Sequence, residues 1–193
     1  RFEAAVVGNL ELTWLIPLSL IGTICGWLYF VSEHASEALA HAIGARPVVK
    51  AMLAGLALAI CGTVLPYTLF AGETQADVLM ETYLTIPAGV LIATGLVKAM
   101  LTPALINLGW RGGHFFPVIF SGVSLGYGLA ILTGADPVFC VAVCTASTMG
   151  AVMRQPVMVV GLLLMCFPLK GIVCMIIAAA IAAGIPLPKP LRK

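Results

Sequence analysis

Five long stretches without a charged residue limit what this chain of 193 residues can fold into. Most of them approach the ~20 residues with which a helix crosses the hydrocarbon layer of a bilayer. Several are shorter or broken by glycine and proline, which indicates tilted, partial and re-entrant helices rather than simple spans. The stretches are residues 12–32, 51–72, 112–135, 137–153 and 171–188. The sequence therefore predicts an all-α, polytopic membrane protein with a single transmembrane domain over residues 1–193.

The composition supports this class. Hydrophobic residues make up 61% of the chain and charged residues 9%, whereas a soluble domain has roughly 25% charged residues. Lys189, Arg192 and Lys193 cluster at the C-terminus, so the positive-inside rule predicts that this end faces the cytoplasm, most simply at a plasma (inner) membrane. The chain begins with Arg1 and nothing in it resembles a signal peptide, so we expect a fragment or a processed piece. The bilayer is the expected surrounding, and no nucleic-acid partner is expected.

Charge and proline patterns divide the first half of the chain. A first helix is expected over 12–31 and continues as an amphipathic segment over 32–43. A second helix is expected over 48–65. The polar stretch 72–81 is the longest expected loop, and an apolar helix interrupted by prolines is expected over 83–108.

Four helices are expected in the second half, over 115–132, from Asp136 to residue 153, over 157–167 and over 170–183. Asp136 and the proline after it form a plausible helix cap and first-turn pair. The whole chain should therefore contain about nine helical segments, some of them partial.

Lys98 lies inside an otherwise apolar helix. Insertion scales give a cost of about 2.5–3.5 kcal/mol for a cation at a helix centre in the membrane. Lys98 should therefore face a cavity or a partner.

A glycine-rich turn lies between two of the apolar stretches and reads Gly-Trp-Arg-Gly-Gly-His-Phe-Phe-Pro over residues 109–117. Gly112 and Gly113 let the backbone approach a ligand closely, and Pro117 falls in a first helical turn, where its missing N–H costs nothing. The unpaired amides and the partial positive charge of a helix N-terminus stabilise an anion. The amides of residues 114–116 are the expected donors. The expected anion-binding residues are Gly112, Gly113, His114, Phe115, Phe116 and Pro117.

A wider pattern surrounds the turn and includes Lys98, Thr102, Gly109, Phe115, Gly122, Gly126 and the step from Arg154 to Pro156. This pattern resembles the CLC family of chloride channels and proton-coupled chloride antiporters. In that family a GGxFxP motif starts a helix that contributes amides to the chloride sites, and the motif stands here as GGHFFP. The resemblance implies the CLC fold, chloride or another small anion as the transported ligand, no other cofactor, a homodimer and no enzymatic activity.

The resemblance covers nearly the whole chain but corresponds to the C-terminal half of a CLC subunit. The family's GSGIP and GREGP motifs, which supply a serine, the gating glutamate and the rest of the anion site, do not occur in this sequence. A complete pathway is therefore expected to require an N-terminal half with motifs of this kind.

The residues expected near the pore or its vestibule are Lys98, Gly109, Arg111 and Arg192. Two of them, Arg111 and Arg192, depart from the family pattern. Arg192 stands where the family has a pore-lining tyrosine. Arg111 replaces a small residue and would either attract anions or extend to the membrane interface. The His114 side chain would either titrate near the ion or be incidental to its backbone amide.

Two other functions are consistent with parts of the sequence. His34, Glu37 and His41 lie at i, i+3 and i+7 and could present a metal site of an intramembrane metalloenzyme, but the stricter HExxH motif is absent and a solvated helix face explains the three residues better. Alternatively, the chain would be a non-conducting assembly module. Its small residues would then serve helix contact, and they include Ala178, Ala179, Ala182 and Ala183.

The six cysteines all lie in apolar stretches, which favours packing over disulfides. Cys140 and Cys144 share a helix face, but no histidine or acidic residue beside them completes a metal site.

Overall fold

The computed structural model describes residues 2, 5–188 and 191, and all regular secondary structure in this part of the chain is helical. The helices are α1 (Asn9–Ile43), α2 (Pro47–Val64), η1 (Pro66–Thr68), α3 (Glu73–Thr82), η2 (Tyr83–Thr85), α4 (Ala88–Asn107), α5 (Phe115–Thr133), α6 (Pro137–Met153), α7 (Pro156–Leu163) and α8 (Ile172–Gly184). The expected all-α class is confirmed, with eight α-helices and two single 3₁₀ turns among the described residues.

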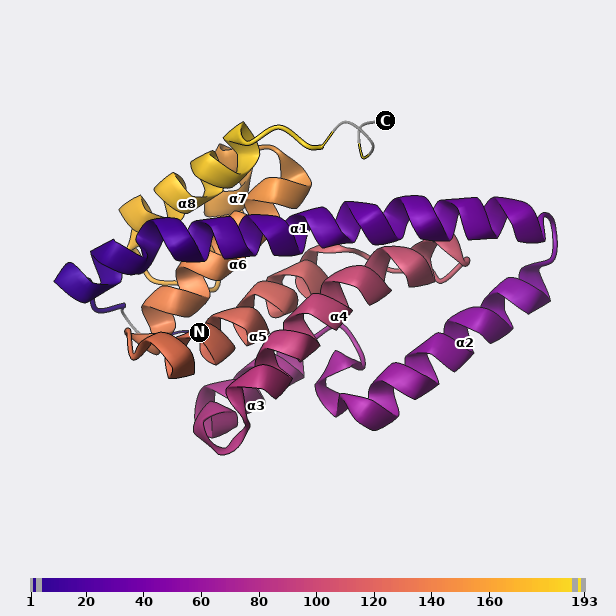
Figure 1. Ribbon diagram of the computed structural model, residues 1–193, viewed down its shortest axis with the longest axis horizontal. Helices are drawn as coiled ribbons and strands as arrows, with labels where there is room; N and C mark the ends of the chain where they lie inside the picture. Colours follow the sequence, from indigo (N-terminus) through magenta and orange to yellow (C-terminus); the bar gives the residue numbers. More distant parts are fainter. Residues whose placement is uncertain (1, 3–4, 189–190, 192–193) are drawn as a thin grey trace.

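The first helix runs along the whole length of the molecule (Figure 1). It has 35 residues, so the expected span and the amphipathic segment after it form one continuous helix. Four helices are long and apolar enough to cross a membrane, namely α1, α2, α4 and α5. α6 and α8 are apolar but shorter, which agrees with the expected mixture of full and partial helices.

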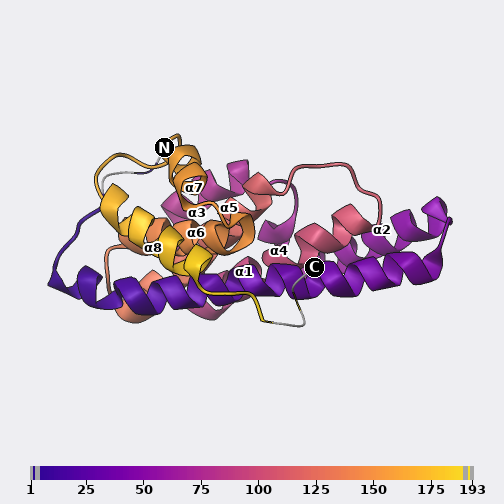
Figure 2. The ribbon, with the colours of Figure 1, turned by 90° about the horizontal axis from the view of Figure 1, so that it is seen from above.

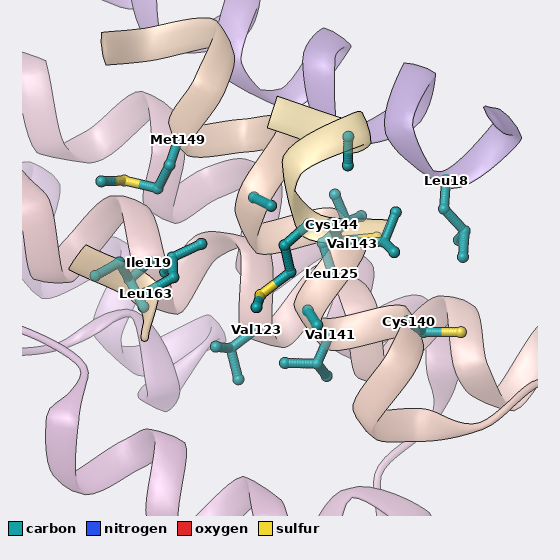
Figure 3. Packing of buried hydrophobic residues seen from close by; sticks show 14 of the residues in the cluster. Leu18, Ile119, Val123, Leu125, Cys140, Val141, Val143, Cys144, Met149 and Leu163 are labelled. Carbon is teal, nitrogen blue, oxygen red and sulfur yellow. The ribbon is translucent and has the colours of Figure 1, made fainter. Parts of the chain in front are cut away.

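The core lies where α5 and α6 pack against each other and against α1, α4 and α8. Figure 3 shows part of this core, with Val123 and Leu125 of α5 close to Val141 and Cys144 of α6. Small residues let these helices approach closely. A Cβ atom added at Gly126 would lie 2.5 Å from the Val141 Cα, so the two backbones are in contact there.

α2 is the least packed of the long helices, and Figures 1 and 2 show it diverging from the core at one end of the molecule. Ala54 is its one buried residue. Most exposed side chains of α2 are apolar, as expected for a surface that meets lipid or another membrane segment.

The caps expected around α6 are confirmed. The Asp136 carboxylate accepts a hydrogen bond from the Phe139 amide at 2.8 Å and so caps the helix. At the other end, Arg154 adopts a left-handed conformation with a φ of 58° and terminates α6.

The prediction of a loop over 72–81 is wrong, because this stretch forms α3. Its Glu, Gln, Ala, Leu and Met residues favour helix, and Leu79 is fully buried. Gly72 starts the helix with a φ of 107° and packs against Phe120 of α5, a tertiary contact that the local polarity does not reveal.

The helix expected over 83–108 begins later than predicted. Tyr83–Thr85 is a separate 3₁₀ turn, and α4 begins at Ala88 directly after Pro87. Pro103, expected to interrupt the helix, lies within α4.

The six cysteines are free thiols. Cys25, Cys140, Cys144 and Cys174 are buried, and Cys61 and Cys166 are partly buried. Their burial agrees with the expected packing role.

Candidate functional site: the glycine turn between α4 and α5

The glycine turn leaves α4 through a glycine that its backbone requires. Gly109 has a φ of 98°, a conformation that favours glycine, and its amide donates to the Ile106 carbonyl at 3.0 Å. The Trp110 amide donates to the Leu105 carbonyl at 3.0 Å. Gly109 therefore ends α4, as a helix C-terminal glycine does.

α5 begins at Phe115, with His114 as the N-cap residue. The Val118 amide donates to the His114 carbonyl at 3.1 Å and forms the first bond of the helix. The amides of His114, Phe115 and Phe116 precede this bond and have no acceptor within the helix, whereas Pro117 has no amide hydrogen. The predicted helix N-terminus after two glycines is therefore present, and its binding of an anion stays a prediction.

A cavity of about 260 Å³ opens beside this helix start. Gly112, Gly113 and Pro117 line it, together with Lys98 of α4 and Arg111 of the turn. Nothing lies within 4 Å of a Cβ atom added at Gly112 or Gly113, so both glycines border open space. The structure therefore brings together five of the residues that the sequence singled out.

The charge of the cavity wall is positive. Among the described residues that line the cavity, Lys98 and Arg111 are basic and none is acidic. Apolar side chains form much of the remaining wall, which lowers the local dielectric constant and strengthens the attraction of an anion to these two cations.

The side chains of two other predicted site residues, His114 and Phe116, point away from this cavity. The His114 ring stacks on Phe115 with centroids 4.5 Å apart and lies 6.4 Å from the Tyr29 ring, so its side chain faces α1. The Phe116 side chain is 51% exposed and lines a separate cavity of about 220 Å³ beside α3. Arg192 lies outside the described residues.

Lys98 has both the cavity and the partners that its position in the membrane requires. Its side chain is 4% exposed, and Nζ donates to the Thr68 carbonyl at 2.6 Å and to the Phe70 carbonyl. Sequence reasoning missed these two acceptors. The one available signal was the need of a buried ammonium for acceptors, which does not say where along the chain they lie.

The histidine and glutamate residues of the alternative metal site do not converge. His34 lines a cavity beside Arg154, whereas Glu37 and His41 line another cavity with Lys50. Within the described part of the chain, no three His, Cys, Asp or Glu side chains lie close enough to hold a metal ion.

The cavity beside His34 has a volume of about 460 Å³ and is larger than the cavity beside His41. It lies where the chain leaves α8. The Arg154 guanidinium group donates from Nη1 to the carbonyls of Ala183 and Ile185 at 2.8 and 2.5 Å. Arg154 thereby connects the end of α6 to the end of α8.

Comparisons with known proteins identify relatives of this fold. The fold matches a solved structure that is described as a CLC-type fluoride/proton antiporter. The two chains superpose with a TM-score of 0.78 and share 21% sequence identity. That match covers 100% of this chain and 49% of the antiporter chain, so this chain spans about half the length of its structural relative. A search of curated proteins found no match.

A sequence model of the voltage gated chloride channel family matches residues 3–186, nearly the whole chain. Together with the apolar helices of the chain, this match identifies a multi-pass integral membrane protein. The chain belongs to the CLC family of voltage-gated chloride channels and related antiporters.

Proposed function

We propose that this chain forms one half of a pathway for a small anion across the membrane, with the N-terminus of α5 as its binding wall. The observation that carries the proposal is the cavity at this helix start. Two glycines border the cavity, and two basic side chains line it. None of the described lining residues is acidic. On this proposal the protein is a channel or transporter subunit rather than an enzyme, and it needs no cofactor besides the transported ion.

The chemistry of the site suits conduction. The α5 N-terminus carries roughly half a positive charge, which stabilises an anion without a direct ion pair. Lys98 and Arg111 add a long-range attraction that concentrates anions in the cavity. Binding of this kind replaces part of the hydration shell and still permits release.

Chloride is the first anion to test, because the family model names chloride channels. Fluoride is the second, because the structural relative is described as a fluoride/proton antiporter. Nitrate, which is larger, tests how the cavity discriminates by size.

The rest of the pathway is proposed to come from an N-terminal half with GSGIP-like and GREGP-like motifs. The structural relative is about twice as long as this chain, which leaves room for such a half. The open, exposed side of residues 109–113 suits coverage by further membrane segments.

A homodimer is proposed through the outer faces of α7 and α8. Val157, Val173 and Ile176 are 87%, 63% and 47% exposed and form part of an apolar surface there. Ala178, Ala179 and Ala182 are buried within the chain instead, since a Cβ atom at Gly150 of α6 would meet the backbone of Ala179. These alanines therefore pack α8 on α6 and do not form an external contact surface.

The test is the substitution Gly113→Val in the complete protein, reconstituted in liposomes and measured by chloride efflux. The valine side chain would enter the open space beside the α5 N-terminus and keep the ion away from the amides, so we expect at least a tenfold loss of flux. Gly89→Val is the matched control, because Gly89 also borders open space but lies at the far end of α4. Equal flux in both variants would refute this site, and absence of flux from the unmodified complete protein would favour the non-conducting assembly module.

A further inference from the structure

The segment that connects α2 to α3 forms a wall of the cavity. Phe70 and Ala71 line the same cavity as the glycine turn. No sequence pattern placed these two residues near the glycine turn. The position of this wall depends on how the segment is held.

Phe70 has an unusual backbone conformation and an unusually exposed side chain for a large apolar residue. Its φ is 59°, in the left-handed region that side chains other than glycine rarely adopt, and its side chain is 79% exposed. A residue remains in this conformation only where its surroundings impose it.

Lys98 supplies that restraint from beneath the segment. Its Nζ donates to the carbonyls of Thr68 and Phe70, and two acceptors from one short segment fix the direction of the chain between them. Thr68 is fully buried, and its amide donates to the Leu65 carbonyl at 2.9 Å. The ammonium group has three donors, and these two carbonyls take two of them.

Further contacts hold the residues on both sides of Phe70. A Cβ atom at Gly62 of α2 would meet the Leu69 side chain at 2.5 Å, and Gly72 packs against Phe120. Between these anchored neighbours, the Phe70 carbonyl accepts the hydrogen bond from Lys98 Nζ.

We propose that Lys98 is a positioning residue that holds Phe70 as a size-determining wall of the anion cavity. Without its two hydrogen bonds Phe70 relaxes to an ordinary backbone conformation, its side chain moves, and larger anions enter. The size effect rests on the proposed anion pathway, whereas the anchoring of the segment does not.

The first test measures the anchoring directly. Hydrogen exchange of the complete protein is followed by mass spectrometry on peptides covering residues 66–72. Lys98→Met keeps the length of the side chain but removes its donors, so we expect exchange in this segment, including the Thr68 and Leu69 amides, to rise at least tenfold. Lys98→Arg retains donors and should stay within threefold of the unmodified protein.

Arg111→Met is the matched control, because Arg111 lines the same cavity from the glycine turn. It should leave exchange in residues 66–72 unchanged. Unchanged exchange in Lys98→Met, or an equal rise in Arg111→Met, would overturn the anchoring role.

The second test measures size discrimination as the ratio of nitrate to chloride flux. We expect at least a threefold increase of this ratio in Lys98→Met and in Phe70→Gly, the latter of which removes the wall side chain and keeps the lysine. If Lys98→Met does not fold, Phe70→Gly alone decides the role of the wall, and an unchanged ratio overturns it. A failure of the anion pathway itself would appear separately, as chloride flux that survives Gly113→Val.

Discussion

Arg154 shows how a single residue in a strained conformation can connect two helices. Its left-handed backbone ends α6, and the conformation costs a residue with a side chain roughly 1–2 kcal/mol. Its guanidinium group donates to two carbonyls at the end of α8, and hydrogen bonds from a charged donor contribute about 1.5–3 kcal/mol each. The side chain therefore offsets the cost of the backbone conformation.

We expect Arg154→Met to lower the free energy of unfolding by about 3–6 kcal/mol, because it keeps the backbone strain and loses both hydrogen bonds. Arg154→Gly loses the same bonds but relieves the strain, so it should destabilise less. Thermal or denaturant unfolding in detergent micelles measures the difference. A methionine variant as stable as the unmodified protein would show that the two carbonyl contacts contribute nothing.

The sequence anticipated some residues of the site better than others. Lys98 was expected in a cavity or beside a partner because a lone membrane cation needs one, and it has both. The His114 side chain was undecided, and it lies toward Tyr29 of α1. Which way a side chain points depends on which helix packs beside it, and the turn sequence does not specify that helix.

At the scale of elements, the contact between α5 and α6 depends on glycines that face a backbone. Cβ atoms at Gly122 and Gly126 would each lie 2.5 Å from a Cα atom of α6, at Thr145 and Val141. Backbone atoms cannot move away as a flexible side chain can, so any larger residue must separate the two helices.

We expect Gly126→Ala to lower the free energy of unfolding by about 1–3 kcal/mol, because overpacking of a tight contact costs this much. Gly89→Ala is the control, since an added Cβ meets nothing there and alanine favours helix by up to ~1 kcal/mol. Unfolding of both variants in the same detergent gives the comparison. If Gly126→Ala were as stable as Gly89→Ala, the helices would not be in backbone contact at this site.

α3 is the helix of this chain that the sequence pattern did not predict. The long apolar helices could be predicted from the length and composition of the apolar segments, since a helix needs ~20 residues to span a bilayer. α3 is short and polar, and only Leu79 is buried. Its helical state depends on packing against α5 and therefore on residues distant in the sequence.

At the scale of the whole molecule, basic residues are more numerous toward one end. Glu11 of α1 lies beside the start of α6, where its carboxylate accepts from the Asp136 amide at 3.2 Å, so this end contains two acidic residues. Arg46 and Lys50 lie at the opposite end, where Lys50 shares a cavity with Glu37 and His41 of α1. Arg154 lies toward this same end, beside His34 and the exit of α8.

This distribution supports the predicted orientation, in which the end that contains Arg46 and the exit of α8 faces the cytoplasm at the plasma membrane. We expect Arg46→Cys to react with a membrane-impermeant maleimide only after cells are permeabilised. Lys170→Cys should react in intact cells, because Lys170 is exposed and lies next to Gly171, which packs near Ala5 at the other end. Cys61 and Cys166 are replaced by serine beforehand, since they are only partly buried. The reverse labelling pattern would invert the orientation.

The sequence alone determined the membrane class, the helical architecture and the position of the glycine turn. These properties follow from local physics, because apolar length sets what can cross a bilayer and glycine followed by proline sets where a helix begins. Tertiary structure alone decided that Phe70 and Ala71 line the same cavity as that turn, that Lys98 donates to the carbonyls of Thr68 and Phe70, and that Arg154 connects α6 to α8. These contacts join residues about 30 positions apart, and their partners are backbone carbonyls, which every residue carries and which leave no signature in the sequence.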